Sequence, residues 1–355
     1  MKPTKPPLSI RKPQRRRVSL SSEQLVRTTL LHPSALPLVV QPTTSLNLTA
    51  WVQHHHETVK RWLQHHGGIL FRGFVVADFG AFIRAIARTP MSYTYRSTPR
   101  TQVGDRVYTS TEYPANRVIP LHNEMAYARE WPSKIAFYCV APAPTGGETP
   151  IADSRRVLSR IDAQIRSRFQ EQGVLYVRNY GSGLDLSWQE VFQTQERQAV
   201  ENYCRQAGIE WTWQGKDGLQ TRQVCQAIAI HPHTQELVWF NQAHLFHTDT
   251  LDTHLRDLLL GTGVGQIPRH AYYGDGSDIP PEVLAHIRQA YAAETVKFLW
   301  QAGDVLLLDN LLVAHGREAF SGSRRVLAGM GDAWGSRNLG RTVLMSSLME
   351  EESCH

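Results

Sequence analysis

The sequence predicts a mainly β protein, with a closed or sandwiched all-β core and helices around it. Short apolar stretches alternate with turn residues, for example near 135–140 and 267–273, as in a fold built from many short strands. Helical spacing of apolar residues is confined to the N-terminal part and the middle third, which differs from the strand–helix alternation of a parallel sheet. With 355 residues, 41% of them hydrophobic, the chain has enough material for a sizeable core.

The first expected elements lie between residues 47 and 88. Residues 47–66 place apolar side chains on one side of a helix, and Gly67 follows where a helix C-terminus favours glycine. We expect a strand at 69–76 and a second helix at 79–88.

The middle third is expected to contain helices around a strand. Residues 154–173 and 187–209 have helical spacing, and 174–181 has a weaker strand pattern. Near the end, residues 302–320 (AGDVLLLDNLLVAHGREAF) give the strongest strand signal, with a buried apolar run between two turns.

The positive charge of the chain is concentrated at its N-terminus. The net charge is +6, from 38 Lys and Arg against 32 Asp and Glu, yet residues 1–20 hold seven basic residues and no acid. The remaining 31 basic and 32 acidic residues nearly cancel. Because nucleic-acid binders usually carry a basic patch on the folded domain, we do not expect nucleic acid as a partner. We expect residues 1–20 to form a basic, Pro-rich, disordered arm, and contact with an acidic partner is the alternative.

No segment has the pattern of a membrane span or a secretion signal. The arginines of the arm are not followed by an apolar run, and no apolar stretch is long enough to cross a bilayer. The cysteines form no CxxC pair and are too sparse for a disulfide scaffold. They are Cys139, Cys204, Cys225 and Cys354. A cytoplasmic location is expected.

Three His-x-Asp/Glu tripeptides are candidates for a metal site, beginning at His55, His122 and His247. Two imidazoles and one carboxylate hold a mononuclear iron by one face and leave the other face open. The usual sequence pattern of such a site is this tripeptide plus a histidine far away in the chain. His55 and Glu57 fall in an expected helix, where positions i and i+2 point apart. Asp249, after His247, is expected to open a helix.

His122 and Glu124 fit a metal site best, because they directly follow a short apolar run and a proline (VIPLHNE). In an extended segment the side chains at i and i+2 share one face and can reach one ion. The third ligand needs a second rigid strand, and His315 ends the strongest strand signal. On these grounds a histidine that merely fills the core, or a zinc site with the same ligands, remains an alternative.

At these residues the chain resembles the taurine dioxygenase and clavaminate synthase-like family of Fe(II)/2-oxoglutarate-dependent oxygenases. The resemblance covers about 67–332. Three blocks carry it: FRGF (71–74), LHNEMAYAREWPSKIAFYCVAPAPTGGETPIADSRRVL (121–158) and DVLLLDNLLVAHGREAFSGSRRVLAG (304–329).

The resemblance implies a double-stranded β-helix (jelly roll) core with a helical insert. It implies a single oxygenase domain over about 21–345, followed by a tail at 346–355. An insert at about 179–250 is expected to cover the site as a substrate lid.

The resemblance also implies roles for individual residues. The implied iron ligands are His122, Glu124 and His315. Thr149, in GGETP, matches the threonine that hydrogen-bonds the co-substrate. Arg325 matches the arginine that clamps the far carboxylate of 2-oxoglutarate, because the family spacing selects it. Its neighbour Arg324 is the alternative, and the two should face opposite sides of a strand.

The activity implied is oxidation of a small molecule, by default hydroxylation, with Fe(II), 2-oxoglutarate and O2. The presence of Glu124 argues against a halogenase, which leaves the carboxylate position empty. HNEMAYA, GGETPIADSR and FNQAHLFH resemble members that modify amino acids or aminoacyl groups in secondary metabolism, some while these are bound to a carrier protein. Asn241 is the candidate substrate contact, and an amide that satisfies backbone groups is the alternative.

Two other functions are considered. A zinc-dependent hydrolase could use the same three ligands, but it needs no dicarboxylate cradle such as Arg325 and Thr149. A non-catalytic jelly-roll binding protein is the second alternative, and the intact triad argues against it.

Overall fold

The computed structural model describes residues 25–31, 36–91, 95, 98–181, 185–251, 257, 261 and 267–335. The expected arm (1–20) and tail (346–355) lie outside these residues. No helix in the described parts of the chain is long and apolar enough to cross a membrane.

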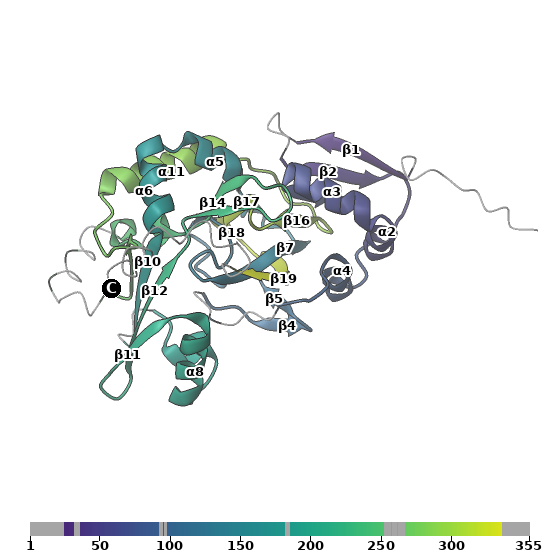
Figure 1. Cartoon of the computed structure of the whole chain (residues 1–355). Coiled ribbons are helices and arrows are strands. Elements are labelled where there is room, and N and C mark those ends of the chain that lie inside the picture. Colours follow the sequence, from purple (N-terminus) through teal and green to yellow (C-terminus); the bar gives the residue numbers. More distant parts are fainter. Residues whose placement is uncertain are drawn as a thin grey trace, which may run out of the picture.

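The largest sheet has eight strands and runs through the middle of the molecule (Figure 1). Its centre is formed by β16 and β7, which pair antiparallel, with β19 on the other side of β7. In spatial order the strands are β1 (Val26–Leu30), β2 (Leu38–Pro42), β3 (Gly68–Phe71), β16 (Val305–Asp309), β7 (Glu130–Ala141), β19 (Arg325–Gly335), β5 (Val107–Thr109) and β4 (Gln102–Gly104).

A second, three-stranded sheet lies against the interior face of the first. Its strands, in order, are β6 (Ile119–His122), β17 (Val313–Arg317) and β9 (Ile151–Asp153). The rings of Phe137, in β7, and His315, in β17, are 5.0 Å apart, so the two sheets face each other. A separate two-stranded sheet is formed by β18 (Phe320–Ser321) and β8 (Thr145–Gly146). This is the sandwiched β core that the sequence predicts.

Three N-terminal helices cover the outer face of the large sheet. They are α2 (Leu48–His54), α3 (His56–His66) and α4 (Phe79–Ile86). The sequence predicts one helix over 47–66, but the backbone breaks at His55, which leaves the helical region at φ −112° and ψ 25°. The strand expected at 69–76 is shorter, because β3 ends at Phe71. Buried aromatic and aliphatic side chains, among them Trp51 and Phe82, fill the space between these helices and the sheet.

Gly67 ends α3 as predicted, in the left-handed conformation with φ 72°. A Cβ atom at this position would lie 2.6 Å from Cγ2 of Val313. Only glycine therefore permits the close approach of α3 to the start of β17, the strand that carries His315.

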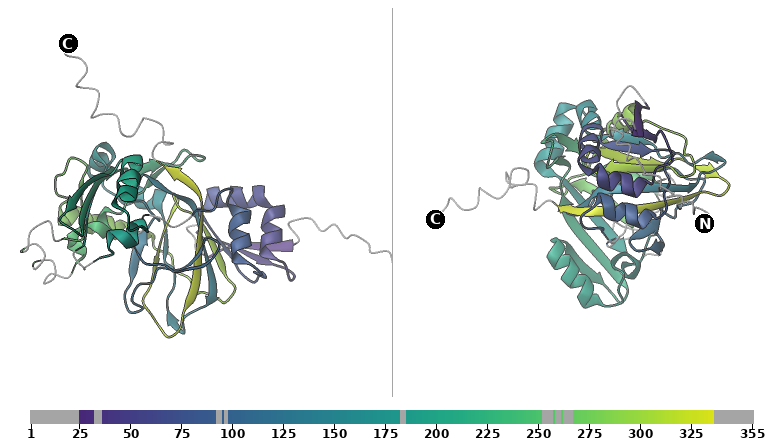
Figure 2. Two further views of the ribbon diagram at one scale, coloured as in Figure 1. Left: turned by 90° about the horizontal axis from the view of Figure 1, so that it is seen from below. Right: turned by 90° about the vertical axis from the view of Figure 1, so that its right-hand side faces the viewer.

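A second unit packs against the other end of the core, as the two views of Figure 2 show. It contains a four-stranded antiparallel sheet in the order β11 (Glu210–Gln214), β12 (Gly218–Cys225), β10 (Val174–Tyr180) and β15 (Arg269–Tyr273). Its smaller elements are α7 (Trp188–Phe192), α8 (Arg197–Ala207), β13 (Ile228–Ile230), β14 (Leu237–Trp239), α9 (Ala243–Phe246) and the 3-10 helix η1 (Thr248–Thr250). Because β15 joins this sheet, the unit is wider than the insert expected at about 179–250.

The helical segments of the middle third are each divided in two. Residues 154–173 form α5 (Ser154–Arg160) and α6 (Ala163–Gln172), and Asp162 caps α6 by accepting a hydrogen bond from the Gln164 amide at 2.8 Å. Residues 187–209 form α7 and α8. A further helix, α11 (Pro281–Glu294), comes later in the chain. All seven residues of β10 are buried, although its strand pattern is weak in the sequence.

Candidate metal centre

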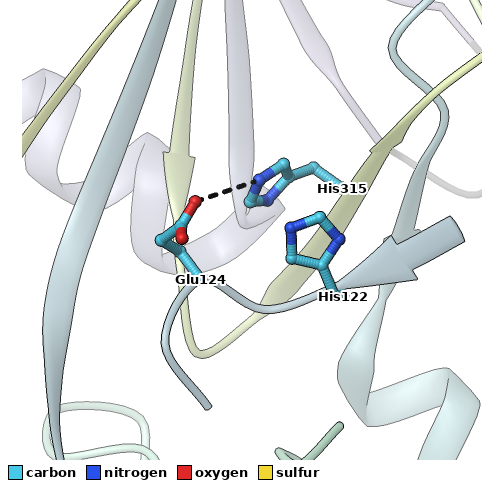
Figure 3. Close-up of side chains that lie close together, drawn as sticks. All are labelled: His122, Glu124 and His315. Atoms are coloured by element: carbon cyan, nitrogen blue, oxygen red, sulfur yellow. Dashed lines mark ion pairs between the residues drawn. The ribbon is translucent and has the colours of Figure 1, made fainter. Parts of the chain in front are cut away.

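His122, Glu124 and His315 meet at one point between the two sheets (Figure 3). One ligand atom from each side chain lies within 4.8 Å of the others, and no other such group of three occurs among the described residues. The imidazole rings are 4.6 Å apart. Nε2 of His315 lies 3.8 Å from Oε2 of Glu124, too far for a hydrogen bond but suitable for two ligands of one ion.

The strand pairing of the small sheet brings the two histidines together. His122 ends β6, and its Cα lies opposite that of His315 in the antiparallel pair of β6 with β17. Residues opposite each other in such a pair project from the same face, so both imidazoles point to the same side. Glu124 lies beyond the end of β6, in a turn, and not in an extended segment as the sequence suggests.

The side chain of Asn310 fixes the turn that carries Glu124. Its Oδ1 accepts a hydrogen bond from the Glu124 amide at 2.7 Å, and its Nδ2 donates to the Glu124 carbonyl at 2.9 Å. Nδ2 also donates to the carbonyl of Pro132 at 2.8 Å, and Asn310 is fully buried. The side chain therefore satisfies both backbone groups of Glu124, and its three bonds hold the carboxylate in place.

Both histidines have the protonation state that a metal requires. His122 Nδ1 donates to the Pro120 carbonyl at 2.8 Å, which leaves the Nε2 lone pair for an ion. Burial lowers the pKa of His122 and holds the pKa of His315 well below its ordinary value, where His122 and Arg100 add to the effect. The neutral imidazoles and the carboxylate form the donor set of a mononuclear iron or zinc site.

Arg100 is a residue of the centre that the sequence does not reveal. Its Nη2 donates to Oε2 of Glu124 at 2.6 Å, and both side chains are only 3% exposed. A lone arginine in the segment STPRT carries no motif, and its contact with Glu124 depends on tertiary structure. No sequence signal distinguishes it from a surface arginine.

Thr149 lies near β17, because the strand that follows it pairs with β17. It precedes β9, in which Ile151 pairs with His315, and it is buried. Its Oγ1 accepts a hydrogen bond from Nε1 of Trp300 at 3.1 Å.

The two neighbouring arginines at the start of β19, Arg324 just before the strand and Arg325 as its first residue, lie in different environments. Arg325 is exposed, whereas Arg324 is partly buried and donates from Nε to the Gly147 carbonyl at 3.0 Å. Gly147 lies two residues before Thr149, so Arg324 is the arginine beside the GGETP segment. Burial lowers the pKa of Arg324 to about 10, and the nearby Arg317 contributes, so its side chain is still a cation at neutral pH.

The remaining sequence candidates have structural contacts. Asn241 is fully buried, donates from Nδ2 to the Ala227 carbonyl at 2.9 Å and accepts from the Ala243 amide at 3.0 Å. Both ends of its amide bind backbone groups, which favours the alternative to a substrate contact. Asp249 forms an ion pair with Arg288 at 2.7 Å, and His247 accepts a hydrogen bond from the Asp249 amide at 3.1 Å. Neither belongs to the metal cluster.

His244 supports β6 from α9 and gives a test of buried electrostatics. Its Nε2 donates to the Leu121 carbonyl at 3.0 Å, and burial lowers the pKa of His244 to about 3.

The folded protein keeps the His244 ring neutral, while the unfolded chain takes up a proton below pH ~6.5, so stability is lost as the pH falls from about 6.5 toward 3. Between pH 6.5 and 5 the free energy of unfolding should fall by about 2 kcal/mol more in the wild type than in His244→Gln. Urea denaturation at the two pH values measures this difference, and parallel losses in both proteins would contradict it.

Comparison with known proteins identifies the family. The model of the family described as taurine catabolism dioxygenase TauD, TfdA family matches residues 31–330. The dapdiamide synthesis protein DdaC of Enterobacter agglomerans is 43% identical over 293 residues, which cover 81% of this chain and 88% of DdaC. A clavaminate synthase-like protein of Arabidopsis thaliana is 33% identical over 313 residues, covering 84% of this chain and 91% of that protein.

A solved structure supports the fold. PvcB of Pseudomonas aeruginosa superposes with a TM-score of 0.52 at 17% identity, covering 88% of this chain and 93% of PvcB. The mainly β jelly-roll fold and the family expected from the sequence are thus confirmed. The chain belongs to the TauD/TfdA family of dioxygenases.

Proposed function

We propose that this chain hydroxylates an amino acid or aminoacyl group in secondary metabolism, with Fe(II) held by His122, Glu124 and His315. The chain is an Fe(II)/2-oxoglutarate-dependent dioxygenase by its family. The observation that carries the site assignment is the convergence of these three ligand atoms within 4.8 Å inside the core. Bound iron, with 2-oxoglutarate and O2, supplies the oxidising chemistry, and the protein supplies binding, orientation and exclusion of water.

Arg324 is proposed to hold the far carboxylate of 2-oxoglutarate, in place of the Arg325 that the sequence favours. Arg324 is partly buried beside Gly147, and Arg317 adds a second positive charge close to it. A partly buried cation with another cation nearby favours an anionic ligand, and a guanidinium can bind a carboxylate through two parallel hydrogen bonds. The Thr149 hydroxyl, next to the same segment, is proposed to complete the cradle.

The substrate class is supported by the relatives. DdaC is named for dapdiamide synthesis, and PvcB is described as an oxygenase of an isonitrile synthetic pathway. These names indicate biosynthetic chemistry, so we propose a small substrate, free or attached to an acyl or peptidyl carrier protein. The unit built on the β10–β12 sheet is proposed as the lid over this substrate.

The test starts from metal-free protein without oxygen. Addition of Fe(II) and 2-oxoglutarate should produce the weak visible charge-transfer band of the chelate, which a zinc hydrolase would not show. Free amino acids and their carrier-bound thioesters are then added with O2, and succinate release and substrate mass are measured. A mass increase of one oxygen with equimolar succinate supports the proposal. If the protein instead hydrolysed a substrate with Zn(II) and without 2-oxoglutarate, the proposed function would be wrong and a zinc hydrolase would take its place.

A further inference from the structure

The guanidinium of Arg100 lies against the carboxylate of the metal triad. Arg100 lies two residues before the start of β4, and the backbone on both sides of it is held in place. The Pro99 carbonyl accepts from the Glu112 amide at 3.0 Å, and the Thr101 amide donates to Oγ1 of Thr109 at 2.9 Å. Both side chains of the Arg100–Glu124 pair are almost fully shielded from water. The structure therefore holds a permanent positive charge at the ligand set.

Arg100 and a metal ion would use the same carboxylate oxygen. The atom that accepts from Arg100 is Oε2 of Glu124, and the same atom faces Nε2 of His315. A carboxylate oxygen has two lone pairs, so it can accept the hydrogen bond and still bind an ion.

This arrangement differs from the usual surroundings of metal ligands. Groups behind metal ligands are commonly carboxylates or carbonyls that make the ligands more basic and strengthen metal binding. A cation has the opposite effect, because it takes up part of the charge of Glu124 and repels a divalent ion, strongly so in a buried site. A divalent ion, Arg100 and the single carboxylate together leave a net charge of about +2 at the centre. Of the two carboxylates of a dicarboxylate dianion, one is proposed to pair with Arg324, and the other would lower the charge at the centre to about +1.

We propose that Arg100 is a positioning residue that makes metal binding depend on dicarboxylate binding at this centre. The metal ion alone binds weakly, and 2-oxoglutarate raises the affinity for the metal ion because one of its carboxylates lowers the positive charge of the centre. By thermodynamic linkage the metal raises the affinity for 2-oxoglutarate by the same factor. The inference rests on the metal triad of the proposed function.

A role in orienting Glu124 alone makes the opposite prediction. If Arg100 only oriented the carboxylate, its loss would weaken metal binding by about 10–100-fold, as for other supporting groups. The backbone of Glu124 is already fixed by Asn310. Arg100 therefore matters less for the orientation of Glu124 than for the charge of the centre.

The experiment measures binding, without turnover. Metal-free, full-length protein is titrated with Co(II) in the absence of oxygen, with and without 2-oxoglutarate, and the visible bands of bound Co(II) report the affinity. In the wild type, 2-oxoglutarate should tighten Co(II) binding by a factor within the usual range of about 5–150. Arg100→Met and Arg100→Gln should both bind Co(II) alone about tenfold more tightly, and the effect of 2-oxoglutarate should shrink by the same factor. Arg100→Lys, which keeps the charge, should resemble the wild type.

The variants separate the possible explanations. Weaker Co(II) binding in Arg100→Met with near-normal binding in Arg100→Gln would show an orienting hydrogen bond and overturn the proposal. Arg72→Gln is the matched control, because Arg72 forms a comparable ion pair, at 2.7 Å with buried Asp304, away from the triad. It should leave both affinities unchanged. If His122→Ala bound Co(II) as well as the wild type, the proposed site itself would fail, independently of the Arg100 series.

Discussion

His315→Ala is expected to abolish substrate-dependent succinate formation, with a loss of at least about 1,000-fold. The imidazole is 4% exposed and supplies the only ligand of the triad that comes from β17. Without it, a carboxylate and one imidazole remain, too few donors to hold iron by one face. His122→Ala should behave alike, since the two rings face each other across the strand pair. Metal content after dialysis and succinate release under saturating Fe(II) measure the effect.

A buried histidine outside the triad provides the control for this loss. His244→Gln changes a ring that is equally buried and supports β6, but whose Nε2 already donates to the Leu121 carbonyl. It should retain bound iron and most of the activity. Equal loss of iron in His244→Gln and His315→Ala would attribute the effect to general damage of the small sheet.

Arg324→Gln is expected to raise the KM for 2-oxoglutarate by about 100-fold, with little change in metal binding. Truncating one partner of a buried charge pair costs about 2–5 kcal/mol, and an isolated carboxylate of the co-substrate would be left without its cation. Arg325→Gln should stay close to the wild type, because Arg325 is exposed. The two variants change neighbouring residues at the start of β19, so each is the control of the other. The intensity of the charge-transfer band against 2-oxoglutarate concentration gives both affinities.

A larger effect at Arg325 than at Arg324 would restore the original assignment from sequence spacing. If both variants changed the affinity for 2-oxoglutarate only slightly and equally, another cation of the core would have to bind its far carboxylate. Either result would leave the metal triad untouched, since neither arginine contacts it through an ion pair in the described structure.

The metal triad could be predicted because each of its residues lies in or directly after a recognisable strand pattern. His122 ends a strand, Glu124 follows two positions later, and His315 lies in the strongest strand pattern of the chain. The pairing of β6 with β17 then brings the histidines face to face. The turn at Glu124 was not predicted, because it depends on Asn310, whose hydrogen bonds join residues 186 positions apart.

The remaining parts of the site could not be read from spacing. Strand alternation should decide between Arg324 and Arg325, but the register shifts between Arg325 and Val326, so counting by two fails there. Arg100 has no motif, and only folding brings it to Glu124. The four-stranded sheet was likewise missed as a unit, because β15 comes from a segment beyond the expected insert.

The side-chain amide of Asn310 connects the segment that carries Glu124 to the segment that leads to His315. Asn310 lies between β16 and β17, and its side chain forms hydrogen bonds with both the amide and the carbonyl of Glu124. The loop after β6 and the start of β17, the strand that carries His315, are therefore joined through this side chain. Contacts within the protein therefore set the positions of Glu124 and His315 relative to each other.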